Sequence, residues 1–292
     1  CLVFAVLLLE RVQRGRRRYA TCGTDYRPTE HRRLRGLAAI GAVVVCLVPV
    51  CLGFLLPLVQ LLLWLNQSGT EAFDGTFLDL SIKSFLLATV AGLLTVIAAV
   101  LIVYTVRLHR TAFMTAISKA TILGYSIPGA VIAVGVMVTL VRLDLSIINS
   151  IGQTFGVSPG LLLSGTVFAL LFAYLVRFLA VAVNPVESGF DRLCGSMDEA
   201  SLSLGKSRMY TLLRINVPLA RGTLLAAGAL VFVDVLKELP LTLILRPFNF
   251  ETLATKTFEL AGEEMVAQSA CGALLIVAAG IVPIILLERF IS

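Results

Sequence analysis

The sequence predicts an all-α protein whose helices cross a membrane about six times. Hydrophobic residues make up 58% of the 292 residues and charged residues only 14%, against about 45–50% and about 25% in soluble domains. The mean hydropathy is +0.94. Stretches nearly free of charge reach the roughly 20 residues that a helix needs to cross a bilayer. They are continuously apolar rather than alternating, which favours helices over a membrane β-barrel.

Six complete spans follow one another along the chain, each a continuous apolar run between polar segments. We expect them over residues 36–64, 84–106, 120–141, 161–183, 222–245 and 266–287. The apolar run 1–9 is too short to span a bilayer, so we expect it to be the remnant of a preceding span. A basic connector over 10–35 then leads into a transmembrane domain over 36–292.

The basic residues predict the orientation of these spans. Of the 24 Lys and Arg residues, 18 lie in one alternating set of loops and tails and four in the other set. The basic set comprises 10–35, 107–119, 184–221 and 288–292. Because cytoplasmic loops carry the excess of Lys and Arg, we expect this set and the C-terminus in the cytoplasm. The net charge of +6 therefore indicates the orientation of the spans in the membrane, not binding to nucleic acid.

The loop 184–221 contains signals for two short helices. Ser196 and Glu199 have the spacing of a capping box, which predicts a helix starting near Met197 and ending at Gly205. A second helix is predicted from about Ser207 to Pro218. Two short amphipathic helices make a docking surface for another protein, although helices of this kind also lie flat on membranes.

The letters Gly205-Lys206-Ser207 are similar to the end of a phosphate-binding loop. The first glycine of that loop is replaced by Ala200, and the preceding segment predicts a helix start instead of a buried strand. We therefore expect no nucleotide site, and no bound cofactor, in this chain.

The same loop resembles the EAA motif of ABC importer permeases that depend on a binding protein. The match runs from Glu199-Ala200-Ser201 through Gly205 to Ile215, Val217 and Pro218, with Ser201 and Val217 as mild departures. The resemblance covers roughly 80–290 and implies the type I importer permease fold. It also implies that the loop docks on a separate ATP-hydrolysing subunit, present as a dimer. The residues it assigns to this contact are Glu199, Ala200, Ser201, Gly205, Ile215 and Pro218.

The fifth predicted span contains three charged residues and a proline. Asp234, Lys237 and Glu238 have helical spacing that places them on one face, and Pro240 interrupts the helix just beyond them. Charges at membrane depth are costly, so they pair or line a water-filled path. We favour a lining of the translocation path. The alternative is that the helix ends near Leu236 and the charges lie at the outer interface.

Residues 236–260 are similar to the corresponding segment of ferric-iron permeases of this importer group. Many of these are single chains of two homologous halves, so the resemblance implies a second permease half, fused upstream. Related permeases carry thiamine, polyamines or 2-aminoethylphosphonate, and these substrates remain alternatives. We predict no firm metal site, because His31, His109 and the six cysteines lack paired ligand spacing.

These observations predict the permease subunit of an ATP-driven importer in the bacterial inner membrane. The resemblance implies that a periplasmic binding protein delivers ferric iron and that a partner ATPase supplies the energy. A membrane enzyme is not favoured, because the short loops offer no convergent set of catalytic residues. An ion-coupled carrier or a channel, with the charges of the fifth span as its coupling site, remains the alternative from another class.

Overall fold

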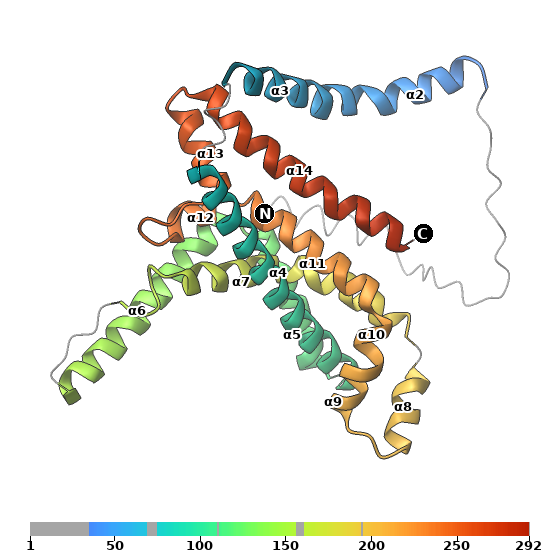
Figure 1. Cartoon of the computed structure of the whole chain (residues 1–292). Helices are drawn as coiled ribbons and strands as arrows, with labels where there is room; N and C mark the ends of the chain where they lie inside the picture. The colour runs from blue at the N-terminus through green and yellow to red at the C-terminus, as the bar shows by residue number, and fades with distance from the viewer. Residues whose placement is uncertain (1–34, 69–74, 110, 156–160, 194, 292) are drawn as a thin grey trace. The chain divides into compact units, whose positions relative to one another are not determined.

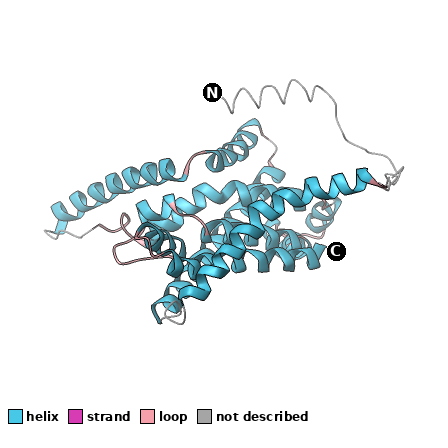
Figure 2. Cartoon of the chain, turned by 90° about the horizontal axis from the view of Figure 1, so that it is seen from above, coloured by secondary structure: helices cyan, strands magenta, loops and turns pink. Residues whose placement is uncertain are grey.

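The structure is a computed structural model that describes residues 35–68, 75–109, 111–155, 161–193 and 195–291. Every regular element among these residues is a helix, and Figure 2 shows no strand in the part of the chain that is described. The predicted remnant 1–9 and nearly all of the predicted connector 10–35 lie outside the described residues. The helical fold class predicted from composition is confirmed.

The chain divides into two compact units, Cys1–Cys51 and Leu52–Ser292. In the first unit the described helix is α2 (Leu37–Val50), which has no buried residue. The second unit holds the hydrophobic core and all the residues discussed below. The elements after α2 are η1 (Cys51–Leu55), α3 (Leu56–Ser68), α4 (Gly75–Leu108), α5 (Ala112–Ser126), α6 (Gly129–Phe155), α7 (Val167–Asp191), α8 (Gly195–Ser203), α9 (Arg208–Thr211), η3 (Leu212–Asn216), α10 (Val217–Leu219), α11 (Arg221–Leu236), α12 (Pro240–Leu245), α13 (Leu253–Gly262) and α14 (Val266–Ile291).

Three helices, α4, α7 and α11, pack on one another and form the centre of the second unit (Figure 1). Small residues line their contacts, and Ala88, Ala173 and Ala227 are fully buried. A Cβ added to Gly92 on α4 would lie 3.3 Å from the carbonyl oxygen of Gly228 on α11. Such close backbone approach is how helices associate in lipid, where burial from water cannot drive their pairing.

Length and hydropathy identify five candidate membrane spans among the described residues, or six if a bent helix pair is counted as one span. The five are Leu37–Gln67, Gly75–Leu108, Gly129–Ile148, Val167–Asp191 and Val266–Pro283. The bent pair consists of Arg208–Leu219 and Arg221–Leu236, which meet at 78°. The chain is therefore a multi-pass membrane protein, as its composition predicted.

Two of the predicted spans are interrupted, and both interruptions contain a proline. The predicted span 120–141 is divided between α5 and α6 at Ile127-Pro128, where Ile127 takes the extended conformation that a following proline favours. The predicted span 222–245 is divided between α11 and α12, and Pro240 is the first residue of α12. The prediction of one continuous span over 120–141 is wrong, whereas the interruption predicted at Pro240 is confirmed, with α11 ending at Leu236.

The fourth predicted span is displaced along the chain. Its helix, α7, runs over Val167–Asp191 instead of 161–183, so the start of the predicted loop 184–221 is helical. The remainder of that loop forms α8, α9, η3 and α10, which together we name the helical hairpin (195–219). The hairpin is joined to α11 through the 78° bend.

Candidate functional site

The turn of the helical hairpin follows the sequence prediction closely. Gly205 ends α8 with φ +72°, a left-handed conformation that glycine adopts without a Cβ clash. Its N–H donates to the Leu202 carbonyl at 2.9 Å, and the Lys206 N–H donates to the Ser201 carbonyl at 3.1 Å. This pair of bonds is a Schellman motif. Ser207 then caps the start of α9, so the predicted end of the first helix and start of the second are confirmed.

The start of α8 differs from the prediction. The helix begins at Gly195, so Ser196 lies inside its first turn instead of at the N-cap position. The predicted capping box of Ser196 and Glu199 is therefore wrong. A capping box occurs instead at the start of α13, where the side chains of Thr252 and Thr255 each accept a bond from the other residue's N–H.

The six residues that the motif assigns to a partner contact divide into an exposed and an internal group. The exposed residues are Glu199, Ala200, Gly205 and Pro218. Ser201 is only 4% exposed, and its hydroxyl lies 2.8 Å from the hydroxyl of Thr211, so it holds α8 against α9. Ile215 is half-buried, and Gly205 forms the turn. The hairpin thus presents part of the motif outward and uses the rest to hold its own shape.

A cluster of three polar side chains, which we name the Arg107 clamp (Arg107, Asp198 and Asn216), fastens the hairpin to two long helices. Arg107, near the end of α4, donates to the Phe190 carbonyl at 2.5 Å and to the Leu193 carbonyl at 3.1 Å. Its Nε lies 3.1 Å from Asp198 Oδ2 on α8. Asn216 donates to the other carboxylate oxygen at 3.1 Å. The clamp therefore joins α4, the end of α7, α8 and η3.

A further bond joins the hairpin to α4, because the Tyr104 hydroxyl donates to the Arg208 carbonyl at 2.9 Å. Sequence reasoning missed all of these ties. It counted Arg107 as a loop charge and used Asp198 only as part of a helix start. The partners of Tyr104 and Arg107 lie 104 and 83 residues away, so no local spacing indicates them.

A second polar cluster lies where the two interrupted helices meet α7, and we name it the Arg177 junction (Arg177, Glu238, Ile127 and Gly129). Arg177 Nε lies 3.2 Å from Glu238 Oε2, between α11 and α12. The same guanidinium donates to the Ile127 carbonyl, between α5 and α6, at 3.0 Å. Glu238 also accepts a bond from the Leu241 N–H at 3.3 Å. One arginine thus connects both interruptions.

Gly129 is part of this junction because of the space it leaves. A Cβ at this position would lie 2.5 Å from Glu238 Oε1 and 2.9 Å from Arg177 Nη1. Arg177 is ten residues into α7, so the junction lies about 15 Å from the start of a helix of 25 residues. The helix α11 ends at Leu236, as the interface alternative supposed, and the position of Glu238 relative to the membrane stays a prediction.

Of the other charges in the fifth predicted span, Asp234 and Lys237 form an ion pair at 2.8 Å. The Lys237 side chain is 61% exposed and that of Asp234 is 13% exposed. The prediction that Glu238 shares their helix face is wrong, because the helix ends at Leu236 and Glu238 pairs with Arg177 instead. Pro240 is exposed at the start of α12. The predicted path residues therefore belong to two separate pairs.

Asp144 on α6 is fully buried. Its carboxylate accepts bonds from the N–H groups of Leu162, Leu163 and Ser164 and from the Ser164 hydroxyl. These bonds satisfy a buried charge and fix the segment that precedes α7. Asp144 was not singled out from the sequence, and its role is structural.

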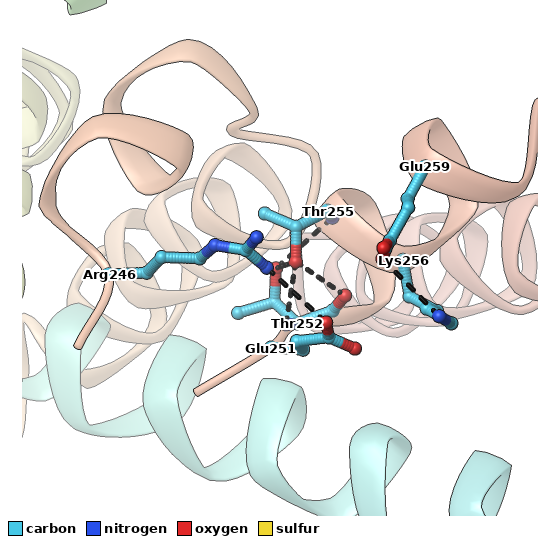
Figure 3. A network of polar contacts seen from close by, with 6 residues as sticks. All are labelled: Arg246, Glu251, Thr252, Thr255, Lys256 and Glu259. Atoms are coloured by element: carbon cyan, nitrogen blue, oxygen red, sulfur yellow. Dashed lines mark hydrogen bonds and ion pairs between the residues drawn. The ribbon is translucent and has the colours of Figure 1, made fainter. Parts of the chain in front are cut away.

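A polar network orders the chain around the start of α13 (Figure 3). Arg246 lies 3.6 Å from Glu251, and Lys256 lies 3.3 Å from Glu259. The Leu253 N–H donates to the Ser84 hydroxyl on α4 at 2.8 Å, which anchors α13 to that helix. A cavity of about 380 Å³ lies beside this anchor, lined by Thr76, Phe77, Leu80, Leu253, Lys256, Thr257, Leu260, Glu263, Met265, Gln268 and Gly272.

Metal ligands do not gather in the described part of the chain, where no three His, Cys, Asp or Glu side chains lie together as a metal site requires. His109 is exposed and lies 3.4 Å from Arg208, while His31 is outside the described residues. The prediction about metal therefore stays a prediction.

Comparison with models of known protein families gives no match. Among individual proteins, the chain is 27% identical over 237 residues to the Fe(3+)-transport system permease protein FbpB 2 of Haemophilus influenzae. That alignment covers 80% of this chain and 44% of the relative, so the chain spans about half the length of that permease. It is also 25% identical over 269 residues to the "Putative 2-aminoethylphosphonate transport system permease protein PhnV" of Salmonella typhimurium, covering 87% of this chain and 95% of the relative.

Two solved structures of a bacterial alginate ABC transporter contain chains of similar fold. One, in complex with a periplasmic protein that holds an alginate pentasaccharide, has a TM-score of 0.60 at 13% identity and covers 86% of this chain and 93% of that chain. The other has a TM-score of 0.65 at 11% identity and covers 86% and 94%. The chain is related to ABC importer permeases and has their fold. The resemblance drawn from the hairpin motif is thereby confirmed at the level of fold and relatives.

Proposed function

We propose that this chain is a permease half of an ATP-driven importer, whose helical hairpin docks on a separate ATP-hydrolysing subunit. The observation that carries the proposal is the hairpin itself. It exposes Glu199, Ala200 and Pro218, and the Arg107 clamp fastens it to the ends of α4 and α7. A rigid, exposed hairpin tied to long apolar helices suits the transfer of movement from a soluble partner into a membrane domain.

The remaining partners and the sides of the membrane belong to the same proposal. The excess of Lys and Arg on the hairpin side of the spans supports a cytoplasmic hairpin and C-terminus in the inner membrane. On the other side, a periplasmic binding protein delivers the substrate. Because the chain spans 44% of the Haemophilus permease, a second, homologous half completes the path. ATP binds the partner subunits, and this chain contributes no cofactor.

For the translocation path, we propose the surface beside the two helix interruptions. Non-helical backbone at membrane depth is tolerated where it is covered by protein or lines a water-filled cavity, not where it faces lipid. The interruptions meet at Arg177, well inside α7, and beside them the Asp234–Lys237 pair leaves Lys237 61% exposed. Glu238 and Pro240 complete this proposed lining.

As the substrate, we propose ferric iron. The similarity to the Fe(3+) permease, together with the ferric-permease-like segment 236–260, supports this choice. Oxygen is the ligand atom that Fe(III) favours, and Asp234 and Glu238 are the carboxylates of the proposed path, each paired with a cation in this structure. The second candidate is 2-aminoethylphosphonate, because the alignment with PhnV covers 95% of that protein. Thiamine and polyamines remain further alternatives within the same architecture.

The test of substrate is uptake by the complete transporter, with both permease halves, ATPase and binding protein, in a strain that lacks its own systems. Radiolabelled Fe(III), 2-aminoethylphosphonate, thiamine and a polyamine are supplied in parallel. We expect ATP-dependent accumulation of Fe(III) alone. If another compound accumulates instead, that compound is the substrate and the assignment of iron is wrong. Transport that persists without the ATPase indicates an ion-coupled carrier or a channel and overturns the proposal.

The docking role is tested at the turn of the hairpin by Gly205→Pro. Proline cannot adopt φ +72° and has no N–H to donate to Leu202, so the turn is lost. We expect ATP hydrolysis that the binding protein no longer stimulates. Gly165→Pro is the matched control, because Gly165 also has φ +72° but lies before α7. Full stimulation in the Gly205 variant contradicts the docking role.

A further inference from the structure

Besides the short chain link from α7 into α8 and the bond from Tyr104 to the Arg208 carbonyl, two routes connect the helical hairpin to the long helices, and they differ in stiffness. The first is the chain itself, which passes from α10 into α11 through a bend of 78°. The residue at the bend, Ala220, has φ −88° and ψ 6°, outside the α-helical range. An interrupted helix does not transmit an axial push as a continuous one does, because its hydrogen-bond ladder stops at the bend.

The second route is the Arg107 clamp, and it is non-covalent. The guanidinium of Arg107 bonds two carbonyl oxygens at the end of α7 and faces the carboxylate of Asp198 on α8. The planar fork of arginine serves three acceptors at once, which the single ammonium of lysine cannot do with the same geometry. Arg107 also places a positive charge at the C-terminal end of α7, where the helix dipole favours it.

The carboxylate at the centre of the clamp is held from both sides. Asp198 Oδ2 faces Arg107, and Asp198 Oδ1 accepts a bond from Asn216, which is 1% exposed. The side chains of Arg107 and Asp198 are 16% and 15% exposed, so water has little access to the ion pair. A largely desolvated pair whose two members each make further hydrogen bonds resists separation more than an exposed pair does.

We propose that Arg107 is a positioning residue through which movement of the helical hairpin reaches α4 and α7. The inference rests on the proposed function, since it states by which contact the docked hairpin moves the membrane helices. The hairpin, α4 and the end of α7 move as one body held by the clamp, and Ala220 acts as the hinge that lets α11 follow at a different angle.

The test uses Arg107→Gln, Arg107→Lys and Asp198→Asn in the complete transporter, with three measurements. The first is co-purification of the ATPase. The second is the amount of substrate imported per ATP hydrolysed. The third, in detergent, is hydrogen exchange of the backbone amides of the hairpin.

We expect the ATPase to co-purify in normal amount, because the exposed motif residues are unchanged. Import per ATP falls at least about fivefold in Arg107→Gln and in Asp198→Asn, the lower end of coupling effects between sites. Arg107→Lys falls by less, since it keeps the charge opposite Asp198. Amide exchange in the hairpin rises in the same order.

Lys83→Gln is the matched control. Lys83 lies on the same helix, α4, and forms an exposed ion pair with Asp79 at 2.5 Å, far along the helix from Arg107. Its loss leaves import per ATP and hairpin exchange unchanged. An unchanged import ratio in Arg107→Gln and Asp198→Asn, or a ratio lowered equally by Lys83→Gln, overturns the proposal.

Failure of this inference about Arg107 can be distinguished from failure of the proposed function. If the unsubstituted transporter neither imports a substrate nor binds an ATPase, the proposed function fails while hairpin exchange still measures the clamp. If exchange is also unchanged in Arg107→Gln, the clamp does not hold the hairpin and the inference fails by itself.

Discussion

The Arg107 clamp and the Arg177 junction are built from the same pair of groups, yet their partners differ. In the clamp, Arg107 on α4 faces the carboxylate of Asp198 on α8. In the junction, Arg177 on α7 faces the carboxylate of Glu238, between α11 and α12. In the clamp, the guanidinium bonds two carbonyls, whereas in the junction it bonds one. Each carboxylate has a second donor, which is Asn216 in the clamp and the Leu241 N–H in the junction. Each cluster also holds one buried atom without a hydrogen bond, Asn216 Oδ1 in the clamp and Arg177 Nε in the junction.

The difference indicates two mechanical roles. A charge with more hydrogen bonds holds its elements more firmly, because a displacement leaves more groups without a partner. The Arg177 guanidinium bonds one carbonyl fewer than Arg107, so it loses less when its helices rearrange. The clamp therefore suits an element that moves as a whole, and the junction suits the place where helices change their relative position. Three substitutions test this contrast.

The largest expected effect follows removal of the carboxylate from the junction. Glu238→Ala leaves the Arg177 guanidinium in the interior without a counter-charge, since the Glu238 side chain is only 8% exposed. Removing one partner of a buried pair costs about 3–5 kcal/mol of unfolding free energy. The measurement is unfolding in detergent micelles, together with substrate uptake, which we expect to be lost.

The double variant Arg177→Met with Glu238→Leu is the control, because it removes both charges and keeps apolar volume. Replacing a buried pair by apolar residues is close to neutral for stability, so most of the loss is recovered. A single variant that loses less than about 1 kcal/mol, as an exposed pair does, contradicts the burial argument.

A smaller effect is expected from Gly129→Ala. The new methyl group occupies the space of Glu238 Oε1, 2.5 Å away, so the side chains of the junction must shift. Overpacking of this kind costs about 1–3 kcal/mol. Gly135→Ala, on the same helix with nothing within 4 Å, stabilises the helix by about 0.5–1 kcal/mol instead. Equal changes in unfolding free energy for the two variants would show that the junction is not tightly packed.

The smallest effect is expected from Asn216→Ala, which removes one hydrogen bond from the clamp. Asp198 loses one donor but keeps Arg107, so the expected loss is about 1 kcal/mol of unfolding free energy. Asn184→Ala, an exposed amide on α7, serves as the control and leaves stability nearly unchanged. If Asn216→Ala costs as much as Glu238→Ala, the two clusters do not differ as argued.

Local features of the fold were predictable from the sequence, and distant contacts were not. Gly205 and Ser207 were placed correctly because a glycine stop and a serine cap act through their neighbours in the chain. Residues 120–141 were expected to form one span, and the full interruption at Pro128 was not predicted. The helix is fully interrupted there because Arg177, from another helix, bonds the Ile127 carbonyl that the interruption frees.

The candidate site shows the same division. The exposed motif residues were carried over from the family resemblance, and the Asp234–Lys237 pair followed from helical spacing. The partners of Arg107 and Glu238 depend on how helices far apart in the chain pack together, and periodicity does not encode that. Arg177 was not assigned a role from the sequence.

The 78° bend at Ala220 also bears on the design of chimaeras in which such a hairpin is transferred from one permease to another. A segment that joins the helix bundle through a bend suggests a unit that can be transferred to another permease by itself. Its attachment to α4 and α7, however, runs through an arginine that lies outside the segment. A chimaera that transplants the hairpin therefore needs a matching arginine on the recipient helix, and compatibility is decided by a residue that an alignment of the hairpin alone leaves out.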